Sequence, residues 1–109
     1  MVITVDLSSD PGRVAIESPE DCGRFHVEAT GAASDGPDWA ALGHALVDAA
    51  AGRVEGDHAY IEVGAVRTLV AGRVGAEWAD DFEKMLAYAR TKGWLDEGGH
   101  AIQAHVEWR

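Results

Sequence analysis

Residues 24–30, Arg-Phe-His-Val-Glu-Ala-Thr, show a clear alternation of apolar and polar side chains. Phe25, Val27 and Ala29 fall on one face, and the residues between them fall on the other. A period of two is typical of a strand with one buried and one solvated face. Residues 100–108 alternate in the same way, so the sequence predicts two half-buried strands.

Further strands are expected nearer the N-terminus and in the middle of the chain. Residues 2–7 and 13–17 are rich in β-branched side chains and flank a turn-forming segment at 8–12, which predicts a hairpin. Residues 58–63 form another apolar run of strand length.

Three segments have helical spacing instead. Residues 76–91 place Trp78 and Phe82 on a continuous apolar stripe, and Gly93 follows as a left-handed cap. A first helix is expected between Pro37 and Gly52, and a short one at residues 65–70. The predicted fold class is α+β, with a single layer of mostly antiparallel sheet packed by two main helices plus a short third helix.

Length and composition limit the class of protein. The chain has 109 residues, of which 47% are hydrophobic, which is typical of one globular domain spanning residues 1–109. Its formal net charge is −10, and its few cations are scattered singly. We therefore expect no nucleic-acid binding, which needs a basic face, and no membrane association.

Cysteine usage and the N-terminus bear on location. Cys22 is the single cysteine in the sequence, so no intrachain disulfide forms and a reducing compartment is expected. Residues 1–6 have neither the basic start nor the apolar core of a secretory signal. The sequence thus favours a cytoplasmic protein.

The tripeptide His-Val-Glu occurs twice on predicted strands, as residues 26–28 and 105–107. Residues two apart in a strand face the same way, so His26, Glu28, His105 and Glu107 are candidate ligands of one divalent metal if the two strands are neighbours. The favoured interpretation is that these side chains only cover a solvated sheet face, as is usual for antiparallel sheets, and no cofactor is predicted.

Two other groups of residues are weaker candidates for a site. His105 and Glu107 have the chemistry of a general base with an orienting carboxylate, although no nucleophile accompanies them in sequence. Trp94 is a candidate aromatic anchor for a ligand or partner. Asp57 and His58, at the start of a predicted strand, are also candidate ligand- or partner-binding residues.

The sequence contains no catalytic motif stronger than His-x-Glu. The favoured function is therefore protein–protein interaction, with a basic partner attracted by the acidic chain, or self-assembly as a homodimer through a bare sheet face or edge strand. The alternative function is a small enzyme or a metal- or ligand-binding module that uses the His-x-Glu pairs.

Overall fold

The computed structural model describes residues 1–9, 12–32 and 36–109, and residues 10–11 of the expected first turn lie outside this part. The described elements are β1 (Val2–Asp6), β2 (Arg13–Glu17), β3 (His26–Thr30), α1 (Trp39–Asp48), β4 (Gly52–Glu55), β5 (His58–Glu62), α2 (Val63–Val70), α3 (Trp78–Lys92), β6 (Ala101–Ala104) and β7 (Val106–Trp108). The predicted α+β class, with two longer helices and a short one, is confirmed.

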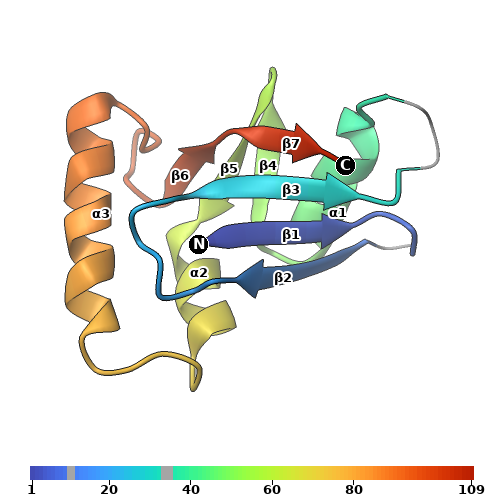
Figure 1. Cartoon of the computed structure of the whole chain (residues 1–109). Helices are drawn as coiled ribbons and strands as arrows, with labels where there is room; N and C mark the ends of the chain where they lie inside the picture. Colours follow the sequence, from blue (N-terminus) through green and yellow to red (C-terminus); the bar gives the residue numbers. More distant parts are fainter. Residues whose placement is uncertain (10–11, 33–35) are drawn as a thin grey trace.

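The strands are divided between two sheets rather than joined in one layer (Figure 1). One sheet has the order β2-β1-β3-β7, in which β1 and β2 form the expected antiparallel hairpin while β3 runs parallel to both β1 and β7. The other has the order β4-β5-β6 and is antiparallel throughout. Most strand pairs are thus antiparallel, and the first sheet is mixed.

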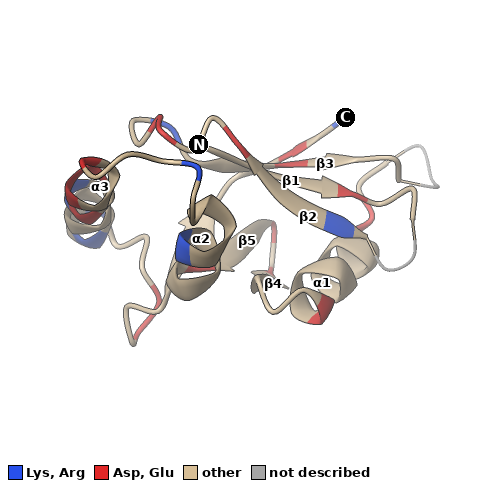
Figure 2. Ribbon diagram, turned by 90° about the horizontal axis from the view of Figure 1, so that it is seen from below, with Lys and Arg blue, Asp and Glu red and all other residues tan. Residues whose placement is uncertain are grey.

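The core lies between the four-stranded sheet and a second layer that contains α1, α2 and the smaller sheet, with α3 at one side (Figure 2). Fully buried side chains of the larger sheet include Ile3, Val5 and Val27, and they face Leu42 and Val66 of the helices. No described element covers the opposite face of the four-stranded sheet. That open face carries the polar residues of the alternating strands.

Local signals explain where the helices begin and end. Asp38 caps α1 by accepting a hydrogen bond from the Ala41 amide through its Oδ1 at 3.0 Å. Gly93 ends α3 in the left-handed conformation, with φ of 75°, as the sequence predicts. Trp78 and Phe82 stack at 4.7 Å between ring centroids, which anchors the first turns of α3 to the core.

Two further features of the fold were not predicted from the sequence. Strand β4 follows α1 directly and forms a hairpin with β5 through Gly56 and Asp57, so the segment after the first helix is not a simple loop. The expected strand over residues 100–108 is interrupted at His105, where the chain leaves the smaller sheet for the larger one. Ile102, Ala104 and Val106 all face the core, so the alternation continues across the break.

Gly52 and Gly64 provide a matched pair for testing this packing. A Cβ on Gly52 would overlap the Tyr60 carbonyl oxygen on the neighbouring strand, whereas a Cβ on Gly64, in α2, would meet nothing within 4 Å. We expect Gly52→Ala to lower the free energy of unfolding by about 2 kcal/mol or more. Gly64→Ala should raise it by about 0.5–1 kcal/mol. Urea unfolding of both variants measures this, and equal effects would contradict the β4–β5 register.

Candidate metal centre on the open sheet face

The register of the larger sheet brings the two His-Val-Glu segments side by side. Strands β3 and β7 are parallel neighbours, and Val27 is the register partner of Val106. Glu28 is therefore paired directly with Glu107. Like charges opposite each other on adjacent strands are destabilising, so this pair needs positive charge nearby.

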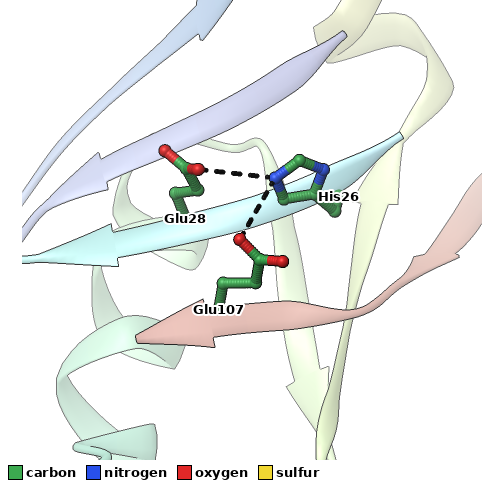
Figure 3. A group of neighbouring side chains, drawn as sticks. All are labelled: His26, Glu28 and Glu107. Atoms are coloured by element: carbon green, nitrogen blue, oxygen red, sulfur yellow. Dashed lines mark ion pairs between the residues drawn. The ribbon is translucent and has the colours of Figure 1, made fainter. Parts of the chain in front are cut away.

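His26 lies on the same face as the two carboxylates, and its ring points between them (Figure 3). The Nε2 atom is 3.5 Å from Glu28 Oε1 and 3.6 Å from Glu107 Oε2. Only 14% of the His26 side chain is exposed, and Nε2 is a buried atom with no hydrogen-bond partner. Burying a polar atom without a partner costs about 1–3 kcal/mol.

These separations are close to those between ligands of one cation, and they also fall within the range of an ion pair between His and Glu. They exceed the 2.7–3.2 Å of ordinary N–H···O hydrogen bonds. Two ligand atoms at tetrahedral angles and about 2.1 Å from a zinc ion lie about 3.4 Å apart. Ligand atoms of His26, Glu28 and Glu107 all fall within 4.8 Å of one another. The three side chains are thus placed to share a metal ion.

Arg109 supplies the positive charge that the carboxylates need. Its Nη2 donates to Glu28 Oε1 at 2.9 Å and to Glu107 Oε2 at 3.1 Å. The charges of Glu28 and then Glu107 raise the pKa of the Arg109 guanidinium above its ordinary value. Arg109 was not predicted as a site residue from the sequence, although extending the alternation of residues 105–107 by one step places it on the same face as Glu107.

His105 does not join this cluster, which corrects the expectation that four ligands converge. The chain changes sheets at this residue, and His105 instead lines a hollow with Phe25, His58 and Trp94. No ion pair between His105 and Glu107 is found among the described residues, and Glu107 contacts His26 and Arg109 instead. The proposed base-and-carboxylate pair is therefore not assembled.

The candidate partner-binding residues lie away from the cluster of His26, Glu28 and Glu107. His58 and Trp94 share the hollow of about 350 Å³ that contains His105, whereas Asp57 points to solvent and pairs with His58 Nδ1 at 2.8 Å. Trp94 also lies 5.7 Å from Tyr88 in an edge-to-face contact, measured between ring centroids. Both rings are substantially exposed, at 41% and 55%. Tyr88 was not singled out from the sequence because it lies on a helix with a stronger apolar stripe.

No protein-family model, curated protein or solved structure matches the chain. The structure itself defines the class of protein as an α+β domain with an open, polar sheet face. In the part of the chain that the structure describes, no helix is long and apolar enough to cross a membrane.

Cys22 has the environment of an unreactive thiol. Partial burial raises its pKa, and the charge of Asp81 raises it further. A higher pKa lowers the thiolate fraction at a given pH, and the thiolate is the reactive form.

We expect alkylation of Cys22 by iodoacetamide at about pH 8 to be slower in the folded protein than in urea. Asp81→Asn should accelerate it, whereas the neighbouring Asp80→Asn should not; equal rates for both variants would contradict this environment.

Proposed function

We propose that the protein binds a divalent transition-metal ion through His26, Glu28 and Glu107. The observation that supports the proposal most is the buried, unpartnered His26 Nε2, which faces two carboxylate oxygens at 3.5 and 3.6 Å. A metal ion between these atoms would give Nε2 a partner and would separate the paired glutamates by positive charge.

The donor set indicates which ions fit. One imidazole nitrogen with two carboxylates suits zinc, manganese or nickel, and the two N···O separations, close to those around a tetrahedral ion, favour zinc. Three protein ligands leave at least one coordination position for water or another ligand, as in catalytic rather than structural sites. The net charge of −10 attracts cations to the protein as a whole.

Arg109 is compatible with a bound ion. Each carboxylate oxygen has two lone pairs, so the guanidinium can remain hydrogen-bonded while the same oxygens coordinate the metal. Carboxylate ligands are commonly oriented by such outer hydrogen bonds.

The single free thiol at Cys22 is consistent with a reducing compartment such as the cytoplasm.

The two copies of His-Val-Glu supply a matched test of the metal site. We expect zinc to bind the wild-type chain and to stabilise it by about 2.7 kcal/mol when free zinc is a hundred times Kd. His26→Ala and Glu107→Gln should each weaken binding by more than about 100-fold, because each removes a ligand. Isothermal titration calorimetry and thermal unfolding measure both effects.

His105→Ala is the control, since the structure places this histidine outside the cluster. It should bind zinc like the wild type. Equal loss of affinity in His26→Ala and His105→Ala would indicate unspecific binding to surface histidines and would reject the proposal.

A second candidate function is self-assembly through the edge strand β2, and its charge pattern supports this. Residues 13–17 read Arg-Val-Ala-Ile-Glu, and β2 lies at the edge of the larger sheet. If two copies pair antiparallel about Ala15, Arg13 of each copy lies opposite Glu17 of the other. Such an interface is self-complementary and closes as a twofold dimer.

One side chain restrains this pairing. Arg73 Nη1 donates to the Ile16 carbonyl oxygen at 3.0 Å and so covers part of the outer edge of β2. Edge strands are commonly protected in this way. Arg73 has to move aside for a second copy to pair, so any dimer should be weak.

Charge exchange tests the self-assembly candidate. We expect a concentration-dependent dimer in sedimentation velocity, which Arg13→Glu should abolish by placing like charges opposite each other. The double variant Arg13→Glu with Glu17→Arg should restore the dimer because the pairs are exchanged. Arg73→Ala should strengthen it. A wild-type chain that stays monomeric at the highest attainable concentration would reject this candidate.

A further inference from the structure

We infer that the metal-loaded centre binds a small oxyanion, a carboxylate or a phosphate, between the ion and the Arg109 guanidinium. This inference rests on the proposed metal site and adds the class of ligand that the site takes. It follows from the unused hydrogen-bond donors of Arg109, from the charge of the cluster once a metal ion is bound, and from the solvent exposure of this part of the sheet.

Arg109 uses only part of its hydrogen-bonding capacity in the cluster. A guanidinium has five N–H donors. The hydrogen bonds to Glu28 and Glu107 both come from Nη2, and among the described residues none is found from Nε or Nη1 of Arg109. Each fork of a guanidinium that binds two oxygens includes Nη2, so the unused Nε and Nη1 groups can each donate to a single oxygen of a ligand.

The charge of the centre favours an anion once a metal is bound. A divalent ion balances the two glutamates, and neutral His26 adds no charge, so Arg109 leaves about one positive charge in excess. A small monoanion neutralises it. Without the metal the same cluster is negative, so the anion site should exist only in the loaded protein.

Arg109 lies on the exposed side of the cluster, next to the position proposed for the ion. The buried His26 ring lies against the sheet, whereas Glu107 and Arg109 are 42% and 59% exposed. Arg109 and His26 contact the same two carboxylate oxygens, so the guanidinium is a neighbour of any ion held there. An oxyanion can then coordinate the ion through one oxygen and accept hydrogen bonds from Arg109 through another.

Cobalt substitution gives a direct measurement of both steps. Cobalt(II) is added first, and its visible absorption reports binding at the centre; acetate or inorganic phosphate is then titrated against the loaded protein. We expect both anions to change the cobalt spectrum with saturation. Separate titrations with acetate and phosphate show whether the centre prefers a carboxylate or a phosphate, because the preferred anion has the lower half-saturation concentration.

Variants of Arg109 test its role. Arg109→Gln should retain cobalt binding but raise the half-saturation concentration of the anion by at least about tenfold, since the charge-assisted hydrogen bonds are lost. Arg109→Lys, which keeps the charge without the planar fork, should lie between the two. Arg90→Gln, in the last turn of α3, is the control and should behave like the wild type.

The outcomes separate the inference from the proposed function. Failure of cobalt to bind the wild type rejects the metal site and the inference with it. Cobalt binding without an anion-dependent change, or an equal anion response in Arg109→Gln, rejects only the inference. Equal anion binding with and without the metal also overturns it.

Discussion

The parallel pairing of β3 with β7 is the constraint on which the site depends. It sets Val27 beside Val106 in the core, and the same register then forces Glu28 and Glu107 together on the outer face. Burial of the two valines, at 0% and 5% exposed, favours this alignment strongly enough to tolerate the repulsion. A one-residue slip of β7 against β3 would turn Glu107 inward, so hydrophobic burial fixes the geometry of the polar face.

The electrostatic consequences follow from that register. Two carboxylates held on adjacent strands require a cation, and Arg109 provides one from the solvent side. It leaves the inner side of the pair to His26, whose Nε2 is too far from either oxygen for a good hydrogen bond. The inner position therefore leaves His26 Nε2 buried and without a hydrogen-bond partner.

Periodicity predicted what depends on neighbouring residues along the chain. The alternation in residues 26–30, the stripe on α3 and the Gly93 cap all required only local spacing, and each appears in the structure. The passage from β6 to β7 was missed because Ile102, Ala104 and Val106 face one common core, so the alternation is the same with or without a break at His105. Strand order, and with it the meeting of His26 with Glu107, depends on long-range pairing that spacing does not encode.

The dependence on long-range pairing also explains why the two identical His-Val-Glu tripeptides have different surroundings. Glu28 and Glu107 occupy equivalent register positions, but His26 lies within the pleat of β3 while His105 lies where the chain changes sheets. Only the first histidine is held on the same rigid surface as the carboxylates. Ligands on paired strands are positioned more firmly than ligands on connecting segments, which favours a site with a defined geometry. In the proposed metal site, the exposed side of this cluster, bounded by Arg109, would leave room for an exchangeable ligand on the ion.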